Sequence, residues 1–259
     1  MDKKERIKQI KDDVESQFSS ITKSIKKGEI DRLSLGTSGI YLNSIFEHLF
    51  SLEILLDKGL IESAGAVGTS LWERSITLQY LLTDPIELTQ MHTSHRKVKK
   101  THWNIKQMVN GIIDFEQLPS HRDPEIEKDL LYIQYTYLCA IKHGNPFTLS
   151  YLNRLEKNRK ESNVIGLNPN FTEQDEDIKN WILLVSITTA FEGLLKFAKQ
   201  FCNQDKINEL SKLNRELKKT IIDNIDLKVP QIILASAEEF REEFWNYLED
   251  LKNTVANKK

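Results

Sequence analysis

The chain has 259 residues, of which 39% are hydrophobic and 29% charged, and it contains only 10 Gly and 6 Pro. The apolar share excludes a disordered chain, and the scarcity of Gly and Pro argues against a turn-dense sandwich or barrel. The formal net charge of -2, from 36 Lys and Arg against 38 Asp and Glu, excludes a binder of nucleic acid or membrane that works through whole-protein charge. A local basic patch is still compatible with this balance.

This composition favours long uninterrupted helices, so we predict an all-α fold, an antiparallel helical bundle of about seven to eight helices without a sheet. Apolar residues at steps of three and four give the helices in chain order. The expected ranges are 7–25, 38–58, 61–83, 86–109, 124–142, 172–201, 206–223 and a last helix after Ser236, with a short helix plus loop within 147–171. Residues 1–203 should form the bundle, and 204–259 a C-terminal helical extension packed on the same domain.

Three helices carry further expectations. The first has an apolar face that would pack on its own domain or against another subunit, and Gly28 should end it. The second should bury an apolar face that includes Tyr41 and Phe50. The third has small residues at Gly65 and Gly68, which let another backbone approach closely, so it should lie in the middle of the bundle.

The chain lacks the sequence patterns of cofactor and metal sites. It has no GxxxxGK[ST], no GxGxxG and no HExxH. Cys139 and Cys202 sit in apolar runs without a CxxC partner, so we expect buried free thiols, no metal site and no cofactor.

Two segments bear on localisation. The first residues, MDKKERIKQIKDD, are charged throughout and lack the apolar core of a signal peptide. The most apolar stretch, from Trp181, is interrupted by Glu192 and Lys196, and its unbroken part is too short to span a bilayer. We therefore expect a buried central helix, a cytoplasmic protein and no membrane partner.

The segment HTSHRKVKKTHW concentrates positive charge. On a continuous helix, positions 92, 95, 96, 99 and 102 share one face that would grip phosphates, with Trp103 stacking on a base. The residues expected to bind nucleic acid are His95, Lys97, Lys99, Lys100, Trp103 and Lys142. The alternative is a charged helix face that is merely solvated.

Two polar groups interrupt apolar helices. Glu73 lies beside Trp72 in a packed helix, and a buried carboxylate needs a partner such as His143, Lys142 or a tyrosine. Otherwise Glu73 and its neighbour Arg74 form a surface pair without a role. His143 would project into a cleft as a proton donor or acceptor, or it would only be stabilised by the negative end of its helix.

The segments ESAGAVGTSLWERSITLQYLL and YTYLCAIKHGN resemble an uncharacterised bacterial all-helical family. Its members carry a Glu inside an apolar helix and then a helix of the form Tyr-x3-Ser/Cys-x3-His. Glu73 matches the first helix, and Tyr135, Cys139 and His143 match the second. The family is similar to the HEPN domains, helical bundles found in RNA-cleaving toxins and phage-defence proteins. The resemblance covers about residues 40–150.

The chain departs from these patterns at two points. The family often has an Arg four residues before the Glu, where this chain has Thr69. HEPN ribonucleases resemble one another in an Arg-x(4–6)-His motif, and no Arg stands at that distance before His143. Arg96 and His102 satisfy the spacing within the lysine-rich run.

The resemblance implies a bacterial HEPN-like protein that binds or cleaves RNA, in phage defence or a toxin system. As an enzyme it would be a metal-independent endoribonuclease, in which His143 or His102 exchanges protons and Arg96 neutralises the phosphate. Glu73 and Tyr135 would complete this catalytic set. The alternative is a non-catalytic interaction protein, a homodimer or a complex with a protein from the same operon, in which Glu73 and His143 form an internal polar tie.

Overall fold

A computed structural model describes residues 3–95, 103–116, 118, 123–142 and 173–224. This part of the chain is helical throughout, and its sole β feature is an isolated bridge between Ile25 and Cys202. The elements are α1 Lys3–Ser20, η1 Ile21–Ser24, α2 Arg32–Asp57, α3 Ile61–Leu81, α4 Pro85–Ser94, α5 Ile105–Phe115, α6 Pro124–Lys142, α8 Glu173–Phe201 and α9 Gln204–Asn224. The predicted all-α bundle is confirmed. The expected short helix within 147–171 and the last helix after Ser236 lie outside the described residues.

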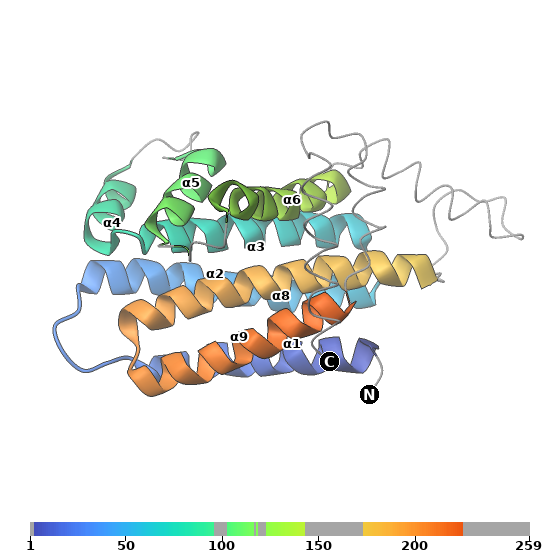
Figure 1. Ribbon diagram of the computed structural model, residues 1–259, viewed down its shortest axis with the longest axis horizontal. Coiled ribbons are helices and arrows are strands. Elements are labelled where there is room, and N and C mark those ends of the chain that lie inside the picture. Colours follow the sequence, from blue (N-terminus) through green and yellow to red (C-terminus); the bar gives the residue numbers. More distant parts are fainter. Residues whose placement is uncertain (1–2, 96–102, 117, 119–122, 143–172, 225–259) are drawn as a thin grey trace, which may run out of the picture.

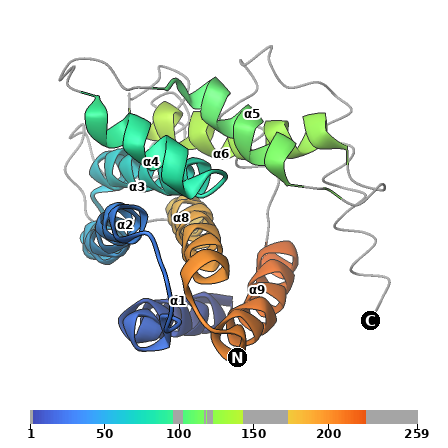
Figure 2. The same ribbon diagram turned by 90° about the vertical axis from the view of Figure 1, so that its left-hand side faces the viewer.

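The helices are stacked in layers (Figure 1). Helices α4, α5 and α6 form one outer layer, which lies over α3. Helices α2 and α8 lie in the middle of the bundle, and α1 and α9 form the opposite side (Figure 2). Two apolar clusters fill the spaces between the layers, one among α1, α2, α3, α8 and α9 and one among α2, α3, α5, α6 and α8. Helix α8 contributes to both clusters and joins the two sides of the bundle.

Glycines in α3 explain how its neighbours come so close. A Cβ on Gly65 would lie 2.6 Å from Cγ2 of Ile141, and one on Gly68 would lie 2.9 Å from Cδ2 of Leu138. At Gly65 the added atom would also lie 3.1 Å from the backbone nitrogen of Lys142, so the α3–α6 spacing requires glycine there, whereas at Gly68 it would meet only the end of a flexible leucine side chain, which can shift. The expectation that small residues place this helix in the middle of the bundle is confirmed.

The apolar face of α1 packs on its own domain. Ile7, Ile10, Val14 and Phe18 are all buried in the cluster shared with α8 and α9. The chain after η1 is also pinned, because the amide of Lys26 donates to the carbonyl of Phe201. This face is therefore used inside the chain and is not available to another subunit.

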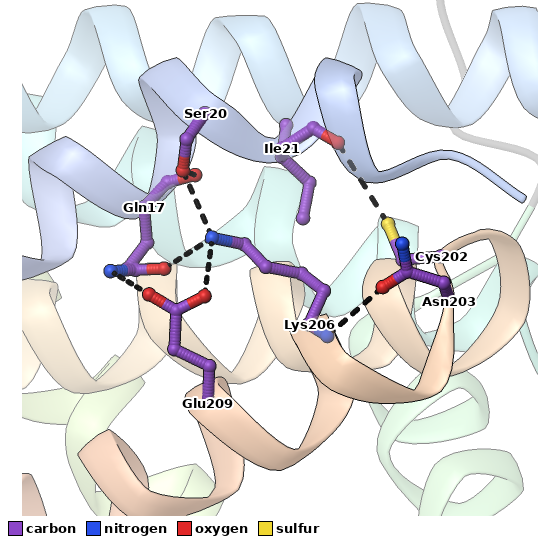
Figure 3. Close-up of polar contacts among 7 residues, drawn as sticks. All are labelled: Gln17, Ser20, Ile21, Cys202, Asn203, Lys206 and Glu209. Carbon is purple, nitrogen blue, oxygen red and sulfur yellow. Dashed lines mark hydrogen bonds and ion pairs between the residues drawn. The ribbon is translucent and has the colours of Figure 1, made fainter.

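A buried lysine ties α9 to α1 (Figure 3). Lys206 Nζ donates to Oε1 of Gln17 at 2.5 Å and to Oγ of Ser20 at 2.9 Å, and it pairs with Glu209 at 3.0 Å. Gln17 in turn donates to the same carboxylate at 3.0 Å. Burial of a lysine is tolerated when its ammonium donors are all used in this way.

The fourth predicted helix is wrong. One helix was expected from residue 86 to 109, but α4 ends at Ser94 and His95 is extended. A new helix, α5, begins after Asn104, whose side chain and Gln107 form a capping box. It then runs through Gly111, which packs against Tyr80, and so continues past the expected end at residue 109.

Helix α2 differs from the prediction at its start and on its face. It begins at Arg32 because the side chain of Asp31 accepts from the Ser34 amide at 2.7 Å. Phe50, expected on the buried face, is 54% exposed, whereas Leu52 is buried.

Helix α8 is the core helix expected from its apolar run. Its segment Ile178–Phe201 is the one described stretch with the length and apolarity of a membrane span. However, 72% of that segment's most apolar window is buried inside the bundle, where its side chains enter both apolar clusters. Its apolarity is therefore used in the core.

Candidate functional site

The structure describes part of the predicted site. Glu73, Tyr135, His95, Trp103 and Lys142 are among the described residues. The predicted residues outside the described part are His143, Arg96, His102, Lys97, Lys99 and Lys100.

Glu73 on α3 meets Tyr135 on α6. The Tyr135 hydroxyl donates to Oε1 of Glu73 at 3.4 Å, and the Tyr135 ring packs on the indole of Trp72, with centroids 4.8 Å apart. Of the partners considered for Glu73, a tyrosine is the one observed. The two segments that carry the family resemblance are therefore in contact through their characteristic residues.

The phenol of Tyr135 acts as a hydrogen-bond donor at neutral pH. Burial raises its pKa above the usual value, and the neighbouring Cys139 and Glu73 raise it further. Because the phenol keeps its proton, it can orient Glu73 or donate to a bound group. It does not serve as a base.

Cys139 lies one helical turn beyond Tyr135 and is a free, half-buried thiol. Burial raises its pKa, an effect that outweighs the lowering by Tyr135 and by the charge of Lys142. A thiol with a raised pKa is a poor nucleophile near neutral pH. Cys202 is the fully buried free thiol that was expected, and burial raises its pKa to about 11.

Thr69 occupies the place where the family often has Arg. It is buried, and its hydroxyl donates to the carbonyl of Gly65 at 2.8 Å. This position therefore supplies no cation.

Trp103 is not available to stack on a base. It is 8% exposed and packs face to face on His92, with centroids 5.6 Å apart, and edge-on to Tyr80 at 5.0 Å. His92 is also hydrogen-bonded through Nε2 to the hydroxyl of Tyr41 at 2.8 Å. We call Tyr41, Tyr80, His92 and Trp103 the aromatic anchor. It joins α2, α3 and α4 to Trp103, which comes before Asn104, the N-cap of α5.

The aromatic anchor and its neighbour His95 hold the chain on both sides of the basic segment, residues 96–102. Before the segment, the His95 amide donates to the carbonyl of His92 at 3.2 Å. After it, Trp103 is packed on the bundle. The single helical face expected for positions 92, 95, 96, 99 and 102 is wrong, because the helix ends at Ser94.

Sequence reasoning missed the role of Tyr41. Burial raises the pKa of Tyr41 above its usual value, and the positive charge of Arg74 offsets part of that rise. No sequence signal links Tyr41 to His92, because the two are 51 positions apart.

The described part of this region holds the exposed guanidinium of Arg74 and the hydrogen-bonded pair of Tyr41 and His92. Within the described residues, no group of three or more His, Cys, Asp or Glu is placed to hold a metal ion. Comparisons of the chain with protein-family models, with curated proteins and with solved structures gave no match.

Proposed function

We propose that the protein binds RNA through residues 96–102 and the adjoining surface of Arg74 and the aromatic anchor, as a HEPN-like bacterial protein of phage defence or a toxin system. The observation that carries this proposal is the packing of Trp103 on His92, with His92 bonded to Tyr41. The described residues on either side of the most basic stretch, His95 and Trp103, are thereby held on the bundle.

Local charge has to supply the affinity, since the net charge of the chain is -2. Lys and Arg side chains that neutralise phosphates release counterions, so the affinity falls as salt rises. The anchor itself contributes position, and the basic side chains contribute the phosphate contacts.

The binding test compares two triple variants of the full chain. Lys97, Lys99 and Lys100 are changed to Ala in one, and the exposed Lys8, Lys199 and Lys212 in its control. Fluorescence anisotropy with a short single-stranded RNA should show weaker binding for the first variant. The slope of its log affinity against log salt concentration should be shallower by about 2, because each lost phosphate contact removes about 0.7 from that slope. An unchanged slope would remove this segment from the site.

Cleavage is the second part of the proposal. His143 or His102 would take the proton of the 2′-hydroxyl or protonate the leaving oxygen, while Arg96 offsets the phosphate charge. Glu73 and Tyr135 would position the acid–base group through their hydrogen bond. The test incubates total RNA and short labelled RNAs with the protein in EDTA, beside His143→Ala and His102→Ala. If the wild-type protein leaves the RNA intact and its overexpression does not affect cell growth, the cleavage proposal is rejected. RNA binding is then judged by the anisotropy experiment alone.

A non-catalytic interaction protein is the second candidate function. In that case the Glu73–Tyr135 hydrogen bond is an internal tie between α3 and α6, and partners bind elsewhere. The observation that favours it is the set of large apolar side chains exposed along α2. The two candidates differ in whether His143→Ala alters RNA cleavage or only stability.

A further inference from the structure

Helix α4 packs along the first part of α2 in a fixed register. Ser34 Oγ of α2 donates to the carbonyl of Pro85 in α4 at 2.6 Å, and the hydroxyl of Tyr41 is hydrogen-bonded to Nε2 of His92 at 2.8 Å. The residues of each pair are 51 positions apart, so the two helices advance together in the same direction. Figure 1 shows α4 as a short helix at one margin of the bundle, over one end of α2. We call this contact the α2–α4 seam.

Two buried hydroxyls lie between these hydrogen bonds. Ser38 is one turn beyond Ser34 on α2, and Thr89 is one turn beyond Pro85 on α4, so both belong to the faces that meet. Each residue is 1% exposed, and neither hydroxyl has a hydrogen bond to the described residues. Burying a hydroxyl without a hydrogen bond is unfavourable, so the middle of the seam opposes the contact that its two ends favour.

Helix α4 buries little apolar surface in return. Thr89 is the one buried residue of this helix, whose whole length is described. Leu88 is partly buried, whereas Ile86 is 56% exposed and Met91 39%. A helix of 10 residues is too short to be stable alone, because most helical stability in proteins comes from the packing of an apolar face. Helix α4 is therefore held weakly.

Non-helical residues at both ends allow α4 to leave α2 without disturbing α3. Asp84 before the helix has φ -140° and ψ 85°, and His95 after it has φ -73° and ψ 113°. The cap at the start is also weak, since the carboxylate of Asp84 accepts from the Glu87 amide at 3.3 Å. Once α4 has left α2, a helix of this length loses its structure, and its amides become accessible to water.

We propose that α4 is a flap, which leaves α2 by local unfolding and thereby separates His92 from Tyr41 in the aromatic anchor. Opening breaks the hydrogen bonds at Ser34 and Tyr41, but it hydrates the hydroxyls of Ser38 and Thr89, so closure is only modestly favoured. The anchor is complete only while the flap is closed. Its regulatory consequence rests on the proposed function: RNA that binds at the anchor selects the closed flap.

Native-state hydrogen exchange of the full chain without RNA tests the flap. The amides of residues 88–94 should exchange at least about 100-fold faster than those of residues 71–79 in α3, after correction for intrinsic rates. Low concentrations of urea should barely change the α4 rates, because local opening exposes little surface. If α4 and α3 are protected equally, α4 opens only when the whole protein unfolds, and the proposal is overturned.

Removing the unsatisfied hydroxyls should hold the flap closed. Thr89→Val and Ser38→Ala each delete a group that closure strips of water, so the exchange of α4 amides should slow, by about fivefold in Thr89→Val. Thr93→Val is the matched control, since Thr93 is exposed on the same helix and its hydroxyl donates to the carbonyl of Thr89 at 2.8 Å. This control should change the rates by less than about twofold.

Removing the hydrogen-bonded hydroxyls should have the opposite effect. Ser34→Ala and Tyr41→Phe each delete one hydrogen bond across the seam, so both should speed the exchange of α4 amides by about threefold or more. If Ser38→Ala and Thr89→Val also speed it, their hydroxyls hold the helix closed, and the proposed mechanism of opening is overturned.

A short single-stranded RNA tests the link between the flap and the RNA site. At ten times its dissociation constant, the RNA should slow the exchange of α4 amides by about tenfold, because it binds only the closed state. If anisotropy shows binding but α4 exchanges at its free rate, the flap does not regulate the site. If anisotropy shows no binding, the RNA proposal fails, and the flap is judged by the exchange of the free protein.

Discussion

The hydroxyl of Tyr135 donates to the carboxylate of Glu73 at 3.4 Å and so links α6 to α3 across 62 positions of sequence. Because the pKa of Tyr135 is raised, chiefly by burial, the direction of this hydrogen bond does not change over the physiological range. Both the catalytic proposal and the scaffold alternative use this contact, and variants of it separate the two.

Tyr135→Phe should lower the free energy of unfolding by about 1 kcal/mol, the usual net worth of one hydrogen bond. Urea unfolding measures it. Tyr132→Phe is the control, since the Tyr132 hydroxyl has no hydrogen bond to the described residues. If RNA cleavage also falls at least tenfold while the fold persists, the contact serves the site. A drop in stability alone identifies an internal tie.

Gly65→Ala should destabilise the protein by about 2 kcal/mol or more, because its Cβ would lie 2.6 Å from Ile141 and force α3 and α6 apart. Gly36→Ala should instead stabilise the monomer by about 0.5–1 kcal/mol, since nothing lies within 4 Å of its Cβ. Thermal and urea unfolding at low protein concentration compare the two. Equal effects would contradict the α3–α6 spacing.

Lys206→Met should cost about 1–2 kcal/mol, because it leaves Gln17, Ser20 and Glu209 without their shared donor. Lys212→Met is the control, an exposed lysine on the same helix, and should change stability by less than about 0.5 kcal/mol. The two variants are compared by urea unfolding. A neutral Lys206→Met would show that the ammonium contacts add nothing to the attachment of α9 to α1.

The same cluster predicts a dependence on pH. The hydrogen bond from Lys206 lowers the pKa of Glu209 below the usual value of 4.5. A lowered carboxyl pKa stabilises the fold above the unfolded value, and this contribution disappears as pH falls through the folded pKa. Glu209→Gln should therefore be less stable than the wild type near neutrality, by under about 1 kcal/mol because the carboxylate is half exposed, and equal to it in acid. A gap that widens below pH 4.5 would contradict the assignment.

A second buried lysine, Lys11, pairs with Glu53 and Glu15, and we expect these two carboxylates to affect stability in different ways. Burial opposes its charge, but the hydrogen bond with Glu53 and the neighbouring carboxylates outweigh that effect and raise the pKa of Lys11. The second carboxylate is that of Glu15, whose Oε1 is buried without a hydrogen bond to the described residues. Glu53→Gln should therefore cost about 1–2 kcal/mol, since it removes the main partner of a buried ammonium.

Glu15→Gln should behave in the opposite way. Burial raises the pKa of Glu15 above 4.5, so the folded protein holds a proton there more readily than the unfolded chain. The ionised carboxylate then opposes folding increasingly as pH rises past the unfolded value. At neutral pH the variant should match the wild type or exceed it by up to about 1 kcal/mol, and the gain should vanish in acid. Urea unfolding at both pH values checks the sign, and a variant less stable than the wild type at neutral pH would show that Lys11 needs both acids.

Sequence rules succeeded where a helix end has its own chemical signal. Asp123 before Pro124 marks the start of α6, and Gly59 follows the end of α2 with a φ of 75°. They failed between residues 86 and 109, where the basic run has no Gly or Pro to mark a break. The capping box of Asn104 and Gln107 can be recognised in the sequence and would have predicted the start of α5.

Local propensity, end signals and the period of apolar residues were enough to predict the class of fold, most helix limits and the central place of α3. They could not predict which groups meet or which helix faces are covered, and these became visible only in the folded chain. It paired Tyr135 with Glu73, buried Trp103 against His92 and left Phe50 exposed. The reason is physical: the period of a helix names its apolar residues, but their burial depends on which other helices pack against each side.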